Sequence, residues 1–305
     1  MSPVNKNKLL FSIVIPAYNY ADTLERAIES VLSQSGDDYQ ILIIDDGSTD
    51  STAQIADDLI RKFPKKIKYF LQKNQGPAVA RNLGAKKSLG EYLFFLDADD
   101  EMAPDLLEYL RIILPNKTSV DVFLGDHISM SSSREKSYSV TEDLPKTREK
   151  CFSAYLSKRL NLSHCAKVVH RRVFEKISYP TELRSSEDIP FMAKLLAICE
   201  CELLSIPMAI VYKHKDSLRH NAVFAKESGE RVADYIFSYN ILPFWAAKYE
   251  KAYRARRCLS VFRTLYTANQ KKEALIFYKR ALALSPLVAL RFSYTKKAIG
   301  AWFCD

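Results

Sequence analysis

Four segments in the first hundred residues share one pattern, a short hydrophobic run followed by a polar loop and an amphipathic stretch. The runs are LLFSIVI (9–15), which ends at Pro16, ILIID (41–45), KYFL (68–71) and YLFFLD (92–97). A continuous apolar run of this length is typical of a strand that is buried on both faces. Strands that alternate with helices through short loops form right-handed βαβ units. The pattern therefore predicts an α/β fold with a mostly parallel sheet flanked by helices.

The pattern is less regular in the rest of the chain. Further elements are predicted as follows: a strand at 120–124, a hairpin or mobile loop at 129–149, helices around 150–160 and 189–198, two short strands flanking Pro207, and helices from about 218 to the end. The stretch ANQKKEALIFYKRALALSP resembles one hairpin of a tetratricopeptide repeat. No repeating array accompanies it, so a plain C-terminal helical extension is favoured.

Composition and cysteine usage narrow the class of protein. The chain has 305 residues, of which 48% are hydrophobic and 27% charged, as in a folded globular protein. No run approaches about 18 apolar residues, and the N-terminal MSPVNKNK has no signal-peptide pattern, so we expect a cytoplasmic protein. The six cysteines are expected to be reduced and to serve in packing, since Cys199 and Cys201 form an isolated C-x-C without a partner pair.

The net charge of +9 is concentrated at the C-terminal end of the chain. From residue 250 onward there are 12 Lys and Arg against 3 acids, whereas the first 249 residues carry 33 bases and 33 acids. A neutral body with a basic tail indicates an anionic partner that contacts the tail.

Acidic residues gather where the predicted strands end. In open α/β sheets ligands bind at the carboxyl ends of the strands. Polar residues at these ends are Tyr18 and Asn19 after the first strand, Asp45 and Asp46 after the second, and Asp97, Asp99 and Asp100 after the fourth. Carboxylates that cluster without a cation repel one another, and oxygen ligands suit Mg²⁺ or Mn²⁺, so a divalent metal is expected here. The alternative is that Asp46 and Asp100 cap the helices that follow them.

Three sequence blocks carry a resemblance to a known family. SIVIPAYN, ILIIDDGSTDST and NQGPAVARNLGAKKSLGEYLFFLDADD resemble, in order and spacing, the N-terminal half of glycosyltransferase family 2, over about residues 9–110. The resemblance implies a GT-A, Rossmann-like fold and an inverting, hexosyltransferase-type enzyme of surface polysaccharide synthesis. Its donor would be a nucleotide-diphosphate sugar, with UDP as the first guess, and its acceptor a hydroxyl of a glycan or a lipid-linked molecule. Residues 1–215 would form the GT-A domain, with a nucleotide-sugar half at about 1–125 and an acceptor half at about 126–215, and 216–305 a basic helical region.

The same resemblance implies roles for individual residues. Tyr18 would stack on the base, and Asp46 would bind the base or ribose. Arg81 would lie near the diphosphate or sugar, although an exposed helix arginine is the alternative. Asp97 would contact ribose or sugar, and Asp99 would be the metal ligand. The remaining expected nucleotide-sugar contacts are Pro16, Ala17, Asn19, Asp45 and Ala98.

Two candidates come from the second half of the chain. SSEDIPF (185–191) resembles the family's block that carries the general base, which makes Asp188 the base and Glu187 its neighbour. The alternative is that these acids open a helix whose N-terminus favours them. In VYKHKDSLRHN, His214 is a candidate metal ligand or leaving-group contact, and a solvated histidine is the alternative.

Other functions remain open or are disfavoured. A nucleotidyltransferase usually has a glycine-rich loop where this chain has PAYNYADT, and no G-x-G-x-x-G follows any strand as an oxidoreductase would need. A catalytically inactive scaffold with the same fold is the alternative from another class. The basic C-terminal helices interleave with aromatic residues and could lie on an anionic membrane, or the aromatics could pack the helices together. No motif for nucleic-acid binding is present, so no such partner is expected.

Overall fold

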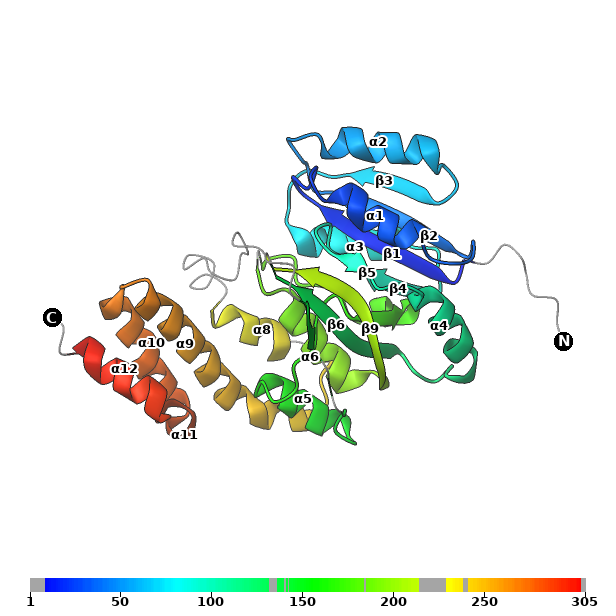
Figure 1. Ribbon diagram of the computed structural model, residues 1–305. Coiled ribbons are helices and arrows are strands. Elements are labelled where there is room, and N and C mark those ends of the chain that lie inside the picture. The colour runs from blue at the N-terminus through cyan, green and yellow to red at the C-terminus, as the bar shows by residue number, and fades with distance from the viewer. Residues whose placement is uncertain are drawn as a thin grey trace. The chain divides into compact units, whose positions relative to one another are not determined.

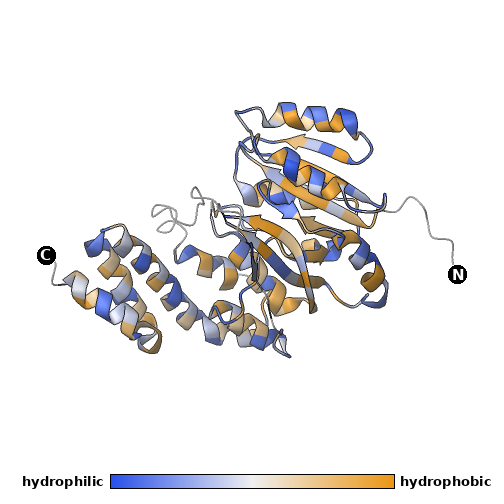
Figure 2. Ribbon diagram, viewed as in Figure 1, coloured by the Kyte–Doolittle hydropathy of each residue, from blue (hydrophilic) through white to orange (hydrophobic). Residues whose placement is uncertain are grey.

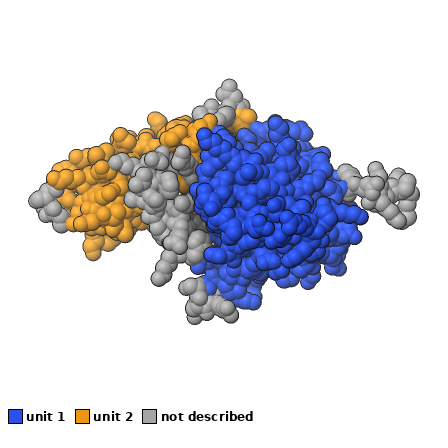
Figure 3. All heavy atoms as spheres, turned by 90° about the horizontal axis from the view of Figure 1, so that it is seen from above, with its two compact units in different colours: residues 1–144, 161–181, 199–214 blue, residues 145–160, 182–198, 215–305 orange. Residues whose placement is uncertain are grey.

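The structure is a computed structural model that describes residues 9–131, 136–139, 141, 143–183, 185–213, 229–237 and 241–302. Its described residues form two compact units, each built from more than one stretch of the chain (Figures 1 and 3). Unit 1 comprises 1–144, 161–181 and 199–214, and unit 2 comprises 145–160, 182–198 and 215–305. Within the described ranges, no helix combines the length and hydropathy that crossing a membrane requires.

Unit 1 is an α/β unit that contains the whole sheet. Its elements are β1 (Phe11–Ala17), α1 (Leu24–Leu32), β2 (Tyr39–Asp45), α2 (Thr52–Lys62), β3 (Ile67–Leu71), α3 (Pro77–Lys87), β4 (Tyr92–Phe95), β5 (Glu101–Met102), α4 (Leu106–Ile113), η1 (Leu114–Asn116), β6 (Val122–Met130), β7 (Lys136–Ser139), β8 (Lys167–His170), η2 (Arg171–Glu175) and β9 (Cys201–Tyr212). The strand order is β3-β2-β1-β4-β8-β6-β9-β5, with β7 paired to β6.

The sheet is mixed, although its first half is parallel as predicted. Strands β3, β2, β1 and β4 run parallel, whereas β8 pairs antiparallel with both β4 and β6. The antiparallel pairs of β8 need no crossover connection over the sheet. Strands β6 and β7 form a hairpin, and β7 with the last residues of β6 lies in the stretch 129–149, where a hairpin or mobile loop was expected.

Pro16 and Pro207 were expected to end strands, but both lie inside strands. Strand β1 continues through Pro16 to Ala17. Leu96 N donates to Val14 O, so the even-numbered residues of β1 face β4, and β4 pairs with β1 only as far as Val14. The missing N–H of Pro16 therefore breaks no ladder bond.

The two short strands expected around Pro207 are one strand, β9. Pro207 pairs with Asp126 at an irregularity, where the register between β6 and β9 shifts on both sides of Asp126. A proline is tolerated in a strand at such a bulge, because a ladder hydrogen bond is already absent there.

The core of unit 1 follows the hydrophobic pattern. All seven residues of β1 and all seven of β2 are buried, and both strands are predominantly hydrophobic in Figure 2. Helix α3 packs closely on β1 at Gly84, where an added Cβ would lie 2.2 Å from Val14 Cγ1. Only glycine allows this approach, and it brings the N-terminal half of α3 next to the ends of β1 and β2.

Unit 2 is helical. Its elements are α5 (Arg148–Leu156), α6 (Asp188–Ile198), α8 (Arg231–Phe237), η4 (Phe244–Tyr249), α9 (Glu250–Thr267), α10 (Lys271–Leu284), α11 (Pro286–Ala289) and α12 (Phe292–Trp302). One core joins α5 and α6 to α8 and the start of α9, around Phe152, Ala193 and Val232. This shared core is why α5 and α6 fall in unit 2, whereas the sequence pattern grouped residues 126–215 with the sheet.

The C-terminal helices have a second core of their own. Phe262 is fully buried and contacts the rings of Tyr266, Tyr278 and Tyr294. These aromatics pack the helices together, whereas Phe292 and Trp302 are exposed. The packing alternative therefore holds for the buried group of aromatics, and membrane contact of the exposed ones stays a prediction.

Candidate active site

The loops that follow β1 and β2 are tied to each other by Asn19. Asn19 N donates to Ser48 Oγ at 3.0 Å, and its Oδ1 accepts from Thr49 N at 2.8 Å. Asn19 adopts a left-handed backbone with φ of 59°, which asparagine tolerates better than most residues. Tyr18, next to it, has a 44% exposed side chain at this edge of the sheet. Pro16 and Ala17 lie just before it at the end of β1, where Ala17 O accepts from Asp46 N at 2.8 Å.

Asp45 is fully buried and serves the loop after β2. Its Oδ1 accepts from Ser48 N at 2.7 Å, which closes a turn in which Gly47 has a φ of 79°, and its Oδ2 accepts from Tyr69 Oη at 2.6 Å. Burial and the hydrogen bond to Asp45 raise the pKa of Tyr69 well above its usual range, so the phenol stays protonated.

Asp46 is buried as well and holds the loop before α3. Its Oδ1 accepts from Gln72 Nε2 at 2.7 Å and from Gln75 N at 2.8 Å, and its Oδ2 accepts from Gly76 N at 2.7 Å. The carboxylate does not cap α2, the helix that follows it, so the capping alternative is wrong for this residue. A carboxylate has about four acceptor positions, and these three bonds leave one for a ligand.

Arg81 comes from α3 and forms an ion pair at the end of β4. Its Nη2 lies 2.7 Å from Asp97 Oδ1, and the arginine is only 6% exposed, so the exposed-arginine alternative is wrong. Burial opposes ionisation of Asp97, but the Arg81 charge and hydrogen bond, the Cys165 thiol and Lys167 together lower its pKa. Asp97 is therefore a carboxylate at neutral pH.

Residues Asp97 to Asp100 form a tight turn after β4. Asp100 N donates to Asp97 O at 3.0 Å, and Ala98, within the turn, is buried. Asp99 is partly exposed, and its carbonyl oxygen accepts from Arg26 Nη2 at 2.5 Å. Asp100 is 3% exposed and its Oδ1 accepts from Tyr212 N of β9 at 3.0 Å, so it does not cap α4.

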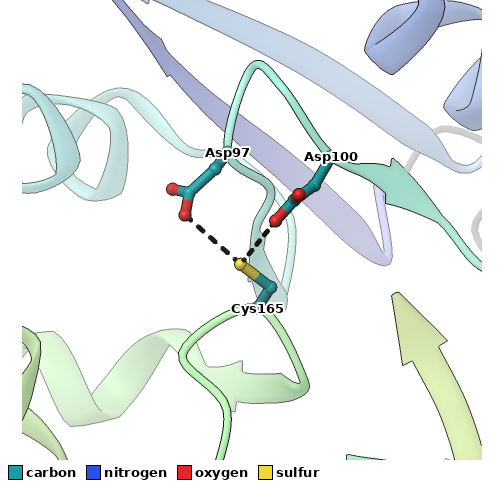
Figure 4. A group of neighbouring side chains, drawn as sticks. All are labelled: Asp97, Asp100 and Cys165. Carbon is teal, nitrogen blue, oxygen red and sulfur yellow. Dashed lines mark hydrogen bonds between the residues drawn. The ribbon is translucent and has the colours of Figure 1, made fainter. Parts of the chain in front are cut away.

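A cysteine lies between the half-buried Asp97 and the buried Asp100 carboxylates of this turn (Figure 4). Cys165 Sγ lies 3.3 Å from Asp97 Oδ2 and 3.2 Å from Asp100 Oδ2. Burial and the neighbouring charges of Asp97 and Asp99 raise the pKa of Asp100 to about 8. Burial and both carboxylates raise the pKa of the Cys165 thiol well above its usual range.

Beside this cluster, the buried Lys167 pairs with the half-buried His164. Lys167 Nζ is 2.9 Å from His164 Nδ1 and 2.5 Å from the His164 carbonyl oxygen. Burial, with the charges of Lys167 and Arg81, lowers the pKa of His164 well below its usual value, so the ring is neutral. Because Nδ1 accepts from the ammonium, the proton of the neutral ring is on Nε2.

The donor set of the turn fits a hard divalent cation only through its carboxylates. The ligand atoms of Asp97, Asp100 and Cys165 lie within 4.8 Å of one another. Mg²⁺ and Mn²⁺ prefer oxygen ligands, and a thiol that keeps its proton is not a ligand. The Asp97 and Asp100 carboxylates fit such an ion, while Cys165 fits the role of hydrogen-bond donor. Asp99 as the metal ligand stays a prediction of the resemblance.

The predicted general base lies in unit 2. Asp188 is the first residue of α6 and is partly exposed, whereas Glu187 beside it is buried. Burial, followed by the Asp188 charge, raises the pKa of Tyr155 well above its usual range. His214, the other candidate of the second half, lies outside the described residues.

Sequence reasoning missed Cys165, His164 and Lys167. Cysteines were assigned to packing, and Cys165 is indeed buried, but its thiol contacts two carboxylates. The signal in the sequence is the polar HCAK just before β8, a strand that pairs with β4. Its meaning depends on the antiparallel pairing, which brings this segment to the end of β4.

Solved structures with this fold are glycosyltransferases of GT-A type. Residues 1–349 of S. aureus TarS, solved in complex with UDP-GlcNAc, match with a TM-score of 0.68 and 22% identity, over 96% of this chain and 89% of that one. The mannosyltransferase PcManGT from Pyrobaculum calidifontis, in complex with GDP-Man and Mn²⁺, matches with a TM-score of 0.56 and 16% identity, over 96% and 86%. The predicted GT-A fold is confirmed.

Sequence relatives and a family model agree with this fold. An uncharacterized glycosyltransferase of Rickettsia felis is 44% identical over 126 residues, 41% of this chain and 20% of that protein. The putative teichuronic acid biosynthesis glycosyltransferase TuaG of Bacillus subtilis is 40% identical over 119 residues, 39% of this chain and 47% of that protein. The matches thus span about a fifth to a half of these relatives. The model of glycosyl transferase family 2 matches residues 12–178, more than half of the chain. The chain belongs to glycosyl transferase family 2.

Proposed function

We propose that the protein transfers a sugar from a nucleotide-diphosphate sugar, with UDP as the first choice, to an acceptor hydroxyl, with inversion at the anomeric carbon. The observation that carries the proposal is the turn after β4, with Asp97, Asp99 and Asp100 and the neighbouring Arg81. It lies at the carboxyl end of the parallel part of the sheet. Ligands bind at this end of such sheets. The UDP and UDP-GlcNAc held by TarS support the choice of donor.

The donor would lie along the ends of β1, β2 and β4. Tyr18 presents an exposed ring on which a base can stack, and Asp46 has one acceptor position left for the base or ribose. Asn19 and Asp45 would shape this end of the pocket by fixing the two loops. Arg81 and Asp97 would lie at the diphosphate or the sugar.

Asp99, helped by Asp97, would hold a Mn²⁺ or Mg²⁺ ion. When bound, such an ion neutralises the charge that develops on a diphosphate leaving group. The Mn²⁺ in the PcManGT complex supports this assignment. Within the chain, Arg81 contributes positive charge at the same place, and its pairing with Asp97 holds it there.

Asp188 would act as general base. One of its carboxylate oxygens would take the proton of the acceptor hydroxyl while that oxygen bonds to the anomeric carbon and the bond to the diphosphate oxygen breaks. The test is turnover of a donor that binds, measured as release of the nucleotide. Asp188→Asn should lower kcat by about 100-fold or more with nucleotide affinity unchanged, because general bases contribute about 10² to 10⁴ in rate. Glu182→Gln is the matched control, because Glu182 is an exposed acid of the same unit. If Asp188→Asn has the same kcat as the wild type, Asp188 is not the general base.

The nucleotide is identified by calorimetry of the full chain with UDP, GDP, dTDP and CDP, each with and without MnCl₂. We expect one of them, UDP first, to bind more tightly when Mn²⁺ is present. If none binds to the folded protein, the scaffold alternative replaces the enzymatic proposal.

The C-terminal helices suggest where the acceptor resides. Leu287, Leu290 and Phe292 are 93%, 60% and 83% exposed within six residues, and Ile299 shares a face of α12 with Phe292. Exposed apolar side chains among Lys and Arg are typical of a surface that lies on anionic lipid. We therefore propose a peripheral location on the cytoplasmic face of the membrane and a lipid-linked or glycan acceptor of surface polysaccharide synthesis, in line with the name of TuaG.

Flotation with vesicles tests this location. The combined change Leu287→Ser, Leu290→Ser and Phe292→Ser should abolish binding to vesicles that contain phosphatidylglycerol, while Ile112→Ser, an exposed apolar residue of unit 1, should have no effect. If the wild type, the triple variant and Ile112→Ser bind the vesicles equally, the membrane proposal is refuted. The proposal for the nucleotide site does not depend on this result.

A further inference from the structure

The Cys165 thiol reaches the turn after β4 from a neighbouring strand. Cys165 lies two residues before β8, which pairs antiparallel with β4. Its Sγ is at hydrogen-bond distance from Asp97 Oδ2, 3.3 Å away, and from Asp100 Oδ2, 3.2 Å away (Figure 4). The thiol thus bridges both ends of a turn that is 65 or more residues away in sequence.

Each of these carboxylates is held at its other oxygen by a different group. Arg81 holds Asp97 Oδ1 at 2.7 Å, and Tyr212 N holds Asp100 Oδ1 at 3.0 Å. An aspartate held at one oxygen can still turn about χ2, whose preference is broad. A contact at the second oxygen restricts this rotation. Cys165 Sγ lies at hydrogen-bond distance from that oxygen in both residues, and its single S–H proton is donated to one of them or shared between them.

Asp99 lies between the two fixed residues. The turn is closed by the hydrogen bond from Asp100 N to Asp97 O, and Asp99 is its third residue. Unlike Asp100, Asp99 is partly exposed. Fixing the side chains at both ends of so short a turn restricts the direction in which Asp99 can point.

We propose that Cys165 is a positioning residue, whose thiol locks Asp97 and Asp100 and thereby holds Asp99 in place for the divalent ion. The proposal rests on the proposed donor site. It requires a hydrogen-bond donor at position 165, whereas a packing role requires an apolar side chain. Serine and valine therefore separate the two roles, since serine keeps the donor and valine keeps an apolar group of similar size.

The test is calorimetric binding of UDP, or of whichever of the four nucleotides binds the wild type, to the full chain with and without MnCl₂. The readout is the ratio of the two affinities, because a general loss of packing lowers both of them together. We expect Cys165→Ser to keep this ratio within about threefold of the wild type. Cys165→Ala and Cys165→Val should lower it about fivefold to tenfold, as the loss of one ordinary hydrogen bond implies, since a thiol is a weak donor. Their affinity without Mn²⁺ should stay within about twofold.

Cys199→Ala is the matched control, because Cys199 is a buried cysteine of the same unit at the opposite end of β9 from Tyr212. Its ratio should equal that of the wild type. A wild-type ratio in Cys165→Val would overturn the proposal, and so would an equal fall in Cys165→Ser and Cys165→Val, which would make the sulfur itself necessary. A wild type that binds nucleotide without any effect of Mn²⁺ is a different result, the failure of the proposed metal site. If Cys165→Ala does not fold, as judged by thermal unfolding, the serine and valine variants decide.

Discussion

Two pairs of aspartates lie at the same edge of the sheet of unit 1, and their surroundings differ. Asp45 and Asp46, after β2, accept hydrogen bonds from neutral donors, which are backbone amides, a phenol and a side-chain amide. Asp97 and Asp100, after β4, both contact the Cys165 thiol. Asp97 also pairs with Arg81, and its charge acts on Asp100. The first pair holds loops in place, and the second pair forms a charged cluster.

The difference shows that the same sequence signal, acids directly after a strand, has two physical uses. Hydrogen bonds from several neutral donors stabilise a buried carboxylate, and such a site has little need of a cation. In the second pair the charge of Asp97 raises the pKa of Asp100, and a positive ion near both carboxylates would relieve that repulsion. The metal is therefore expected at the end of β4.

The largest expected effect comes from breaking the ion pair of the second cluster. Arg81→Ala leaves Asp97 without its cation, and removal of one partner of a buried pair costs about 3–5 kcal/mol. Since the Asp97 side chain is 31% exposed, we expect a loss of about 2–4 kcal/mol in the free energy of unfolding, measured by urea denaturation. Arg81→Lys, which keeps the charge, should lose less. A loss for Arg81→Ala below that for Arg81→Lys would contradict the account.

The second-largest effect is expected from removing Asp46, whose hydrogen-bond donors are neutral. Asp46→Ala leaves the amides of Gln75 and Gly76 without their acceptor and should cost about 2–3 kcal/mol in the free energy of unfolding. The loss should not depend on Mn²⁺, because the partners of Asp46 are neutral. Asp57→Ala, an exposed acid on α2, is the control and should stay within about 0.5 kcal/mol of the wild type. If the loss in the free energy of unfolding of Asp46→Ala changes when Mn²⁺ is added, the contrast between the two pairs is contradicted.

The smallest expected effect on the free energy of unfolding concerns a buried lysine of unit 2. Burial lowers the pKa of Lys194, in α6, to about 8. Between about pH 8 and the unfolded-state value the unfolded chain binds more protons, so stability should rise with pH there, and the full penalty applies below pH 8. Lys194→Met should therefore stabilise the protein by about 1–2 kcal/mol at pH 7. The gain should shrink as the pH rises from 8 to 10, as measured by urea denaturation at each pH. A gain that is independent of pH would show that the charge of Lys194 is not its cause.

Much of the first half of the fold could be predicted, because buried parallel strands appear as continuous apolar runs. The runs at 41–45 and 92–97 led directly to β2 and β4 and to the acids after them. The strand ends at Pro16 and Pro207 were predicted wrongly. Pro16 is tolerated because β4 does not pair with β1 beyond Val14, and Pro207 because it lies at a register shift.

The part of the site that could not be predicted depends on the antiparallel pairing of β8. Neither periodicity nor spacing indicates that the segment before β8 lies at the end of β4, so Cys165, His164 and Lys167 gave no signal of their contacts. The shared core of α5, α6 and α8 was equally hidden, because long-range packing between helices leaves no local pattern in the sequence.

The most direct test of the central claim is the effect of Mn²⁺ on UDP binding by three full-length proteins, the wild type, Asp99→Asn and Asp105→Asn. Asp105 is an exposed acid six residues further along the chain, whose left-handed backbone asparagine tolerates, so it serves as the matched control. The account predicts that Mn²⁺ strengthens UDP binding to the wild type and to Asp105→Asn, and that Asp99→Asn loses this gain while its binding without Mn²⁺ is unchanged. An undiminished gain in Asp99→Asn would contradict the claim that the turn after β4 holds the metal.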